Sequence, residues 1–147
     1  MKPSKDERGQ VTLLIIGFAS ILLMAIVVVI DASAAYLQRQ GLDNLADGAA
    51  LYGADLGSAA IYEQGLGEGR LLQQEAAVKE AVHDYHARAH AGSRFPGIDV
   101  GVHVDPVGRS VTVRLQAPLD LPLTIPGSPS SPTVGASSTA AVTLLAG

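Results

Sequence analysis

The stretch from Val11 to Ile30 reads VTLLIIGFASILLMAIVVVI, and its only polar side chains are those of Thr12 and Ser20. It is 20 residues long, so a helix rising about 1.5 Å per residue would cross the roughly 30 Å hydrocarbon core of a bilayer. Fourteen of its residues are Leu, Ile, Val or Phe, which together favour insertion by about 4 to 8 kcal/mol. A buried helix in a soluble chain this small would need apolar partners on every side, which the remaining sequence does not supply. The stretch therefore predicts one transmembrane helix, residues 11–30.

The composition of the whole chain limits the classes of protein it can belong to. Its 147 residues leave room for the span and one body of modest size, and the absence of Cys excludes disulfides and thiolate chemistry. The residues after the span hold twelve acidic and seven basic side chains, which argues against nucleic-acid binding. No cofactor motif and no spacing of catalytic groups is present. We therefore expect no cofactor and no enzymatic activity.

Basic residues flank the span asymmetrically. Lys2, Lys5 and Arg8 precede it, whereas only Arg39 lies within the 20 residues that follow it. Because basic residues favour the cytoplasmic side of a span, we expect residues 1–10 in the cytoplasm and the body outside. This predicts a single-pass protein of the cell membrane.

Three fates are open for this N-terminus, and an uncleaved anchor is the leading one. Cleavage between Gly9 and Gln10 is typical of type IV pilin-like precursors, but Leu14 stands where their fifth mature residue is usually Glu. Cleavage after Ala34, in a small-residue stretch, would instead release a secreted protein. The run is longer than an ordinary signal-peptide core, which argues against this third fate.

Residues 31–56 are expected to continue the helix and to carry an apolar seam. The seam recurs at heptad spacing and comprises Ala35, Leu42, Leu45, Ala49, Tyr52 and Leu56. Gly41, Gly48 and Gly53 each weaken an isolated helix by about 1 kcal/mol, so this segment needs a partner. The seam suits a sheet, another helix or a second copy of the chain.

A pattern of small and charged residues accompanies the span. Glu7-Arg8-Gly9 stands before it, and the box Ala46-Asp47-Gly48-Ala49-Ala50-Leu51 follows it. The positions that carry the pattern are Gly9, Asp31, Tyr36, Ala46, Asp47, Ala49, Ala50 and Leu51. Residues 7–54, about a third of the chain, resemble the N-terminal module of TadE/TadG-like proteins of tight-adherence (Tad, or Flp) pilus assembly. The resemblance implies a structural component whose partners are other pilus or secretion subunits, although this chain departs from the family pattern at Asp43-Asn44-Leu45, Gly48 and Tyr52.

A glycine-rich hinge is expected over residues 57–69, followed by a second helix over residues 70–92. The GxGxG of residues 65–69 lacks the flanking features of a nucleotide-binding loop. The apolar stripe expected on the second helix comprises Leu71, Val78, Val82, Tyr85 and Ala89. Its polar side carries His83, His86 and His90, at i, i+3 and i+7, which could ligate zinc with Asp84 or Glu80. Solvated surface histidines are the leading interpretation.

Residues 97–145 are expected to form an antiparallel β region, because the apolar period changes to two. A hairpin is predicted, with apolar faces at Ile98, Val100, Val102 and Val104 on one strand and Val111, Val113 and Leu115 on the other. Pro118 and Pro122 place residues 119–125 at a sheet edge or in an extended segment. A Pro/Ser-rich loop at residues 126–132 would precede a last strand within residues 133–145.

The expected fold is α+β and pilin-like. A transmembrane helix continues into a long amphipathic helix, followed by a second helix and a small antiparallel sheet that covers the seam. The predicted function is a membrane-anchored, minor pseudopilin-like component of a Tad/Flp-type pilus or related secretion apparatus. It would act by packing, with the span in lipid and the 35–56 helix face against other subunits or a second copy. The alternatives are a membrane-tethered metal-binding or enzymatic domain that uses the three histidines, and a secreted effector cleaved after Ala34.

Overall fold

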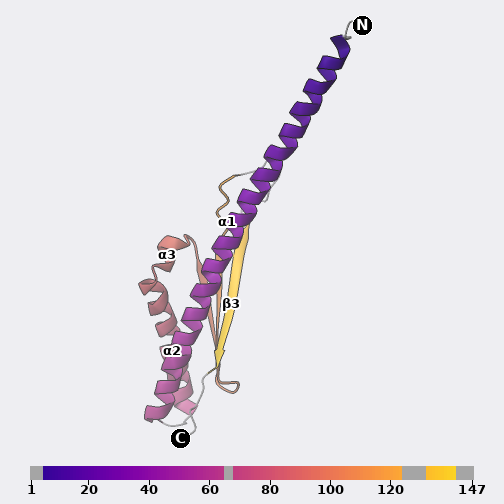
Figure 1. The fold of residues 1–147 in the computed structure, drawn as a ribbon. Coiled ribbons are helices and arrows are strands. Elements are labelled where there is room, and N and C mark those ends of the chain that lie inside the picture. Colours follow the sequence, from indigo (N-terminus) through magenta and orange to yellow (C-terminus); the bar gives the residue numbers. More distant parts are fainter. Residues whose placement is uncertain (1–4, 65–67, 124–131, 142–147) are drawn as a thin grey trace. The chain divides into compact units, whose positions relative to one another are not determined.

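The structure of the protein is a computed structural model that describes residues 5–64, 68–123 and 132–141. The chain forms two compact units. The first contains Met1–Tyr36 with Asp120–Ser128, and the second contains Leu37–Leu119 with Pro129–Gly147. The helices and strands follow in the order α1, α2, α3, β1, β2 and β3 (Figure 1), so the α+β fold class is confirmed.

Helix α1 spans Lys5–Gln64 and contributes to both units. It is longer than the sequence predicts, because it continues through the expected start of the hinge at Gly57. One glycine costs a helix about 1 kcal/mol, and the Ala, Glu and Gln residues that follow favour the helix. The Ser58 hydroxyl also donates to the Ala54 carbonyl over 2.9 Å. The rest of the expected hinge includes residues 65–67, which lie outside the described residues.

Helix α2 spans Glu68–Arg88, and a short helix, α3, spans Ala91–Arg94. The sequence predicts one helix here that Gly92 closes, whereas the break falls at His90, whose φ of 52° is left-handed. The carbonyl of His90 then accepts the amide hydrogens of Ser93 and Arg94. Gly92 therefore lies inside α3 rather than ending α2.

The sheet has three antiparallel strands in the order β1-β2-β3. Strand β1 spans Asp99–Asp105, β2 spans Ser110–Pro118 and β3 spans Thr133–Ala141. The predicted hairpin is confirmed, with Val102 opposite Val113. The carboxylate of Asp105 closes its turn by accepting the amide hydrogens of Val107 and Gly108 over 3.0 and 2.9 Å.

The remaining β predictions have mixed outcomes. The last strand is present over Thr133–Ala141, and residues 142–145 of its expected range lie outside the described residues. Residues 119–123 form no strand, and the chain bends at Pro122 and Leu123. Residues 124–131, which hold nearly all of the Pro/Ser-rich loop, also lie outside the described residues.

The core of the second unit lies between one face of the sheet and the two long helices. Its buried side chains are Leu42, Leu45, Ala46, Ala49, Ala50, Ala54, Val78, Val82, Ala91, Phe95, Val111, Val113, Leu115, Ala117, Ala136 and Ala140. The opposite face of the sheet is polar and exposed, and Thr112 and Thr139 join their hydroxyls across it over 2.8 Å. The strict alternation of side chains along β2 predicts a sheet with one buried face and one solvent-exposed face.

Candidate functional site

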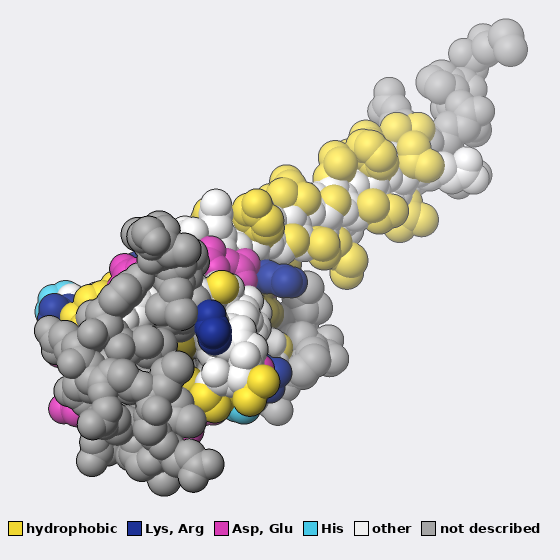
Figure 2. Space-filling model, turned by 90° about the horizontal axis from the view of Figure 1, so that it is seen from below, with side chains coloured by type: hydrophobic (Ala, Val, Ile, Leu, Met, Phe, Trp, Pro, Cys, Tyr) yellow, Lys and Arg dark blue, Asp and Glu magenta, His cyan; other side chains and the backbone are white. Residues whose placement is uncertain are grey.

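The apolar stretch of α1 is the first candidate surface. Its side chains are exposed along its length, from Leu13 at 74% to Ile30 at 44%, and Figure 2 shows hydrophobic side chains covering the visible face of this part of α1. Within the described residues, α1 is the one helix long and apolar enough to cross a membrane. The Ser20 hydroxyl donates to the Ile16 carbonyl over 2.8 Å, so this polar group is satisfied inside the helix. The surface suits lipid because the helix also satisfies its own backbone.

A polar boundary follows directly after this apolar surface. The Asp31 carboxylate accepts the amide hydrogen of Leu123 over 3.2 Å, and the Ser33 hydroxyl donates to the Val29 carbonyl over 2.7 Å. Asp31 and Leu123 both belong to the first unit. This contact joins two segments 92 residues apart.

The small residues of the Ala-Asp-Gly-Ala-Ala-Leu box bring α1 close to its neighbours. Ala46, Ala49 and Ala50 are fully buried, whereas Asp47 is exposed and Leu51 is 61% exposed. A side chain on Gly48 would place its Cβ 2.0 Å from the Tyr85 hydroxyl. The box therefore builds the helix-to-helix contact with its small residues and leaves Asp47 and Leu51 on the outer side of the helix.

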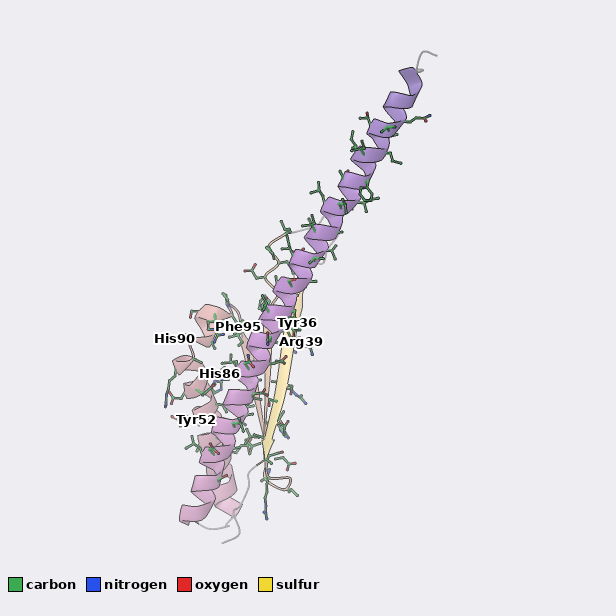
Figure 3. All side chains as sticks on the ribbon, viewed as in Figure 1. Tyr36, Arg39, Tyr52, His86, His90 and Phe95 are labelled. Atoms are coloured by element: carbon green, nitrogen blue, oxygen red, sulfur yellow. The ribbon has the colours of Figure 1, made fainter. Side chains whose placement is uncertain are left out.

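Two more glycines of α1 mark close contacts in the same unit. A Cβ on Gly41 would lie 2.9 Å from Phe95, and one on Gly53 would lie 3.1 to 3.3 Å from Val82, Val111 and Val78. Sequence reasoning treated these glycines only as helix-weakening residues. Gly41, Gly48 and Gly53 recur among alanines at spacings of seven and five residues, and this was the available signal for a closely packed face. Of the residues labelled in Figure 3, Tyr52 belongs to α1, His86 belongs to α2, and Phe95 directly follows α3.

The apolar seam needs a correction. Leu42, Leu45 and Ala49 are buried as predicted, but Tyr52 is only partly buried and Leu56 is 41% exposed. The buried face instead includes Ala46, Ala50 and Ala54, because the helix repeats every 3.6 residues and drifts from a heptad line. Because the chain's own sheet and α2 cover this face, its buried residues are not available to a second copy or to another subunit.

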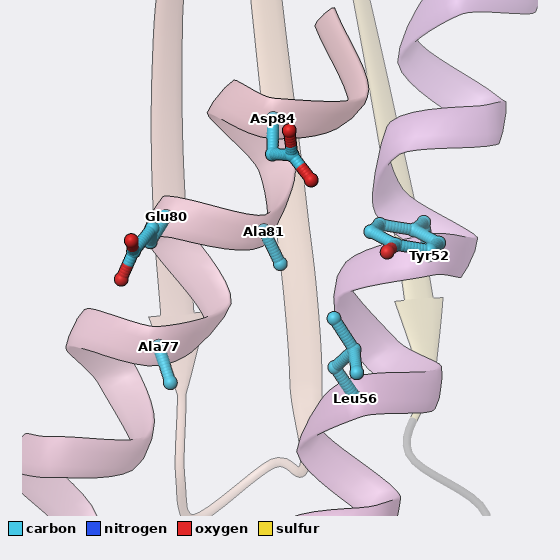
Figure 4. A pocket seen from close by; sticks show the side chains of 6 residues that line it. All are labelled: Tyr52, Leu56, Ala77, Glu80, Ala81 and Asp84. Carbon is cyan, nitrogen blue, oxygen red and sulfur yellow. The ribbon is translucent and has the colours of Figure 1, made fainter. Parts of the chain in front are cut away.

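A shallow groove lies between α1 and α2 (Figure 4). Its volume is about 340 Å³, and it is lined by Tyr52, Leu56, Ala77, Glu80, Ala81 and Asp84. The Asp84 carboxylate points toward α1, whereas that of Glu80 points away from it (Figure 4). Asp84 is ion-paired with Arg88, whose guanidinium lies 5.8 Å from the Tyr52 ring centroid. The pairing offsets the charge of the carboxylate that faces the groove, and the lining of the groove is a mixture of polar and apolar side chains.

The three candidate metal-binding histidines are not brought together. His83 and His90 are exposed, whereas His86 is only 6% exposed. One ring nitrogen of His86, Nδ1, lies 2.7 Å from the Val82 carbonyl and donates to it. Burial lowers the pKa of His86, which favours the neutral ring. Among the described residues, no group of three or more His, Asp or Glu side chains is placed to hold a metal ion.

The remaining predicted positions lie along the outer surface of α1. Gly9 and Gln10, on either side of the first predicted cleavage position, are exposed on α1. Ala32, which lies before the other predicted cleavage position at Ala34, is also exposed on this helix. Tyr36 is 67% exposed and Leu37 is 65% exposed. Arg39 forms a surface ion pair with Asp43 at 3.9 Å, one turn further along the helix. Such exposed pairs contribute little to stability.

These features define a class of protein with one long N-terminal helix, apolar and exposed at first and then packed by a small-residue face into an α+β body. Residues 9–56, about a third of the chain, match the family model described as putative Flp pilus-assembly TadE/G-like. No curated protein and no solved structure matches the chain. The match covers both the apolar surface and the small-residue face. It supports a component of pilus assembly and, together with the apolar helix, anchoring in a membrane.

Proposed function

We propose that this protein is a membrane-anchored structural component, of the minor pseudopilin type, of a Tad/Flp-type pilus or a related secretion apparatus. The observation that carries the proposal is the family match over residues 9–56, which begins with the exposed apolar helix and ends with the core-forming face. The described residues offer a lipid-suited helix and a small packed body. The proposal therefore assigns the protein a role in assembly and gives no residue a catalytic step.

The proposed mechanism is lateral packing in the membrane and just outside it. The small-residue face of α1 is covered by other parts of the same chain. We therefore expect other subunits to contact the outer side of the helix. Tyr36, Leu37 and Leu51 are large apolar side chains exposed there, at 67%, 65% and 61%. Exposed aromatic and aliphatic side chains of this kind are typical of protein interfaces.

Site-specific photo-crosslinking in native membranes tests this proposal. A photoreactive residue at Leu51 should form adducts with other pilus-assembly subunits. Gln116 is the matched control, because it is exposed on the polar face of the sheet. Adducts from Gln116 but none from Leu51 or Leu37 would contradict packing through α1. A full-length chain that stays in the soluble fraction without detergent would contradict the proposal as a whole.

The state of the N-terminus separates the alternatives that the sequence left open. The proposed form is an uncleaved anchor, which mass spectrometry would detect as an intact N-terminus. A mature start at Gln10 would indicate pilin-type processing, and a start at Ala35 would indicate a secreted protein. The histidine-based alternative has no favouring observation, because His86 is buried apart from the exposed His83 and His90.

A further inference from the structure

The contact between Asp31 and Leu123 ties a non-helical segment to the end of the apolar surface. Leu123 donates its amide hydrogen to the Asp31 carboxylate over 3.2 Å. Both residues belong to the first unit, which takes in Asp120–Ser128 although the sheet that precedes this segment belongs to the second. The contact between Leu123 and Asp31 therefore lies within one unit.

The height of this contact along α1 is set by the sequence. Asp31 directly follows Ile30, the last residue of the 20-residue apolar run. Because a helix rises about 1.5 Å per residue, Asp31 lies within one turn of the end of the apolar surface. A carboxylate is costly inside hydrocarbon, so this level corresponds to the boundary between lipid and water. Leu123 is held at the same level.

The segment that reaches this level is rich in leucine and lacks positive charge. Residues 119–123 read Leu-Asp-Leu-Pro-Leu. Leu121 is partly buried, Pro122 is exposed, and Leu123 is 38% exposed. These apolar side chains are exposed beside a helix that suits lipid. Lipid around that helix is therefore the apolar environment that they reach most directly.

Two backbone amide groups of the segment have hydrogen-bond partners. Non-helical backbone is tolerated near hydrocarbon only where its hydrogen-bonding groups have partners. Leu119 donates its amide hydrogen to the Pro132 carbonyl over 2.8 Å, and Leu123 donates to Asp31. Pro122 has no amide hydrogen to satisfy. The Asp31 carboxylate thus supplies a partner for the amide hydrogen of Leu123.

We propose that residues 121–123 form a second membrane contact, in which Leu121, Pro122 and Leu123 lie in the interfacial layer of the bilayer and Asp31 holds them there. The partner is the lipid surface itself, continuous with the surface that surrounds α1. This inference rests on the proposed membrane anchoring of α1. Since the segment carries Asp120 and no basic residue, the contact is apolar and does not require anionic lipid.

The test uses the full-length chain in phosphatidylcholine vesicles that contain nitroxide-labelled lipids. The chain has no native Cys, so a polarity-sensitive fluorophore can be attached to a single introduced cysteine. Leu123→Cys probes the proposed contact. Val107→Cys is the matched control, an apolar residue of the β1–β2 turn that is 92% exposed. Ser20→Cys probes the middle of the apolar helix.

The expected result is a blue-shifted emission and several-fold stronger quenching at position 123 than at position 107, with lipids labelled near the headgroup quenching position 123 best. Anionic lipid should not change this quenching. Asp31→Ala should lower the quenching at position 123, whereas Asp31→Asn should keep most of it because its amide oxygen still accepts a hydrogen bond.

Two different failures are distinguishable. Strong quenching at position 20 with no more quenching at position 123 than at position 107 would overturn this inference and leave the anchor intact. No quenching at position 20 would overturn the proposed anchoring, and the inference with it. Quenching at position 123 that Asp31→Ala leaves unchanged would overturn the role assigned to Asp31.

Discussion

The imidazole of His86 is buried with one nitrogen bonded and the other without a partner. Its Nδ1–H donates to the Val82 carbonyl, and Nε2 has no hydrogen-bond partner in the described part of the chain. A buried polar atom left without a partner costs about 1 to 3 kcal/mol. His86 is therefore a destabilising residue beside a core that is otherwise apolar.

We expect His86→Leu to raise the stability of the folded body and to weaken its dependence on acid. Burial lowers the pKa of His86 in the folded chain, whereas the unfolded chain has the ordinary value near 6.5. The unfolded state therefore binds a proton first as the pH falls. The free energy of unfolding is thus unaffected by this ring above about pH 6.5 and decreases as the pH falls below that value. Thermal unfolding in detergent at about pH 8 and pH 5 measures both effects.

His83→Leu is the control for this prediction, because His83 is exposed on the same helix. It should leave the acid sensitivity of the folded body in place. An equal loss of acid sensitivity in the two variants would show that the effect does not arise from the buried ring.

We expect Gly48→Ala to destabilise the body although alanine favours helices. The new Cβ would lie 2.0 Å from the Tyr85 hydroxyl and 2.8 Å from Cζ of the same ring, so the ring must move. Overpacking costs about 1 to 3 kcal/mol, which equals or exceeds the roughly 1 kcal/mol that alanine gains in helix propensity. Denaturant unfolding measures the net effect. Asn44→Ala, an exposed change on the same helix, should be neutral or slightly stabilising.

Single residues also mark the limit of prediction from sequence. The burial of Ala46, Ala49 and Ala50 agrees with a packed helix face, but the partner of Gly48 lies 37 positions away at Tyr85, and nothing local identifies it. The same holds for Asp31 and Leu123, 92 residues apart. His86 was assigned to a polar helix face because its own polarity suggested solvent, whereas tertiary packing places it inside.

At the scale of elements, the sheet was the easier part to predict. Alternation along β1 and β2 identifies the buried faces because successive side chains of a strand point to opposite sides. The helix boundaries are harder to predict, because glycine composition indicates a break at Gly57 and a stop at Gly92. The structure instead uses Gly57 inside α1 and ends α2 before a left-handed His90. Glycine composition alone does not distinguish a hinge from a close contact.

We expect Leu115→Ala to destabilise the body by about 2 to 5 kcal/mol, the usual cost of a large cavity in a core. Leu115 lies on the central strand with no exposed surface, opposite Val100 on one side and Ala136 on the other. Gln116→Ala, at the next position on the exposed face, should change stability by no more than about 0.5 kcal/mol. Denaturant unfolding compares the two variants, and similar losses would mean that the sheet does not bury this face.

At the scale of the whole molecule, the two units differ in whether their apolar side chains are buried or exposed. The second unit has a core of Ala, Val and Leu with Phe95 as its one aromatic member, so a body of this size has little stability to spare. The first unit exposes large apolar side chains that water disfavours. Helix α1 contributes residues to both units.

The orientation of the chain in the membrane is the prediction at this scale. Lys2, Lys5 and Arg8 before the span outnumber Arg39 after it, so the N-terminus should stay in the cytoplasm. With no native Cys in the chain, Lys5→Cys and Val107→Cys can be labelled in intact cells with a membrane-impermeant maleimide. Val107 is 92% exposed in its turn, so burial would not protect it. Labelling at position 107 with protection at position 5 is expected, and permeabilised cells should label both. The reverse pattern would contradict the orientation, and protection of both positions in intact cells would show that the body has not crossed the membrane.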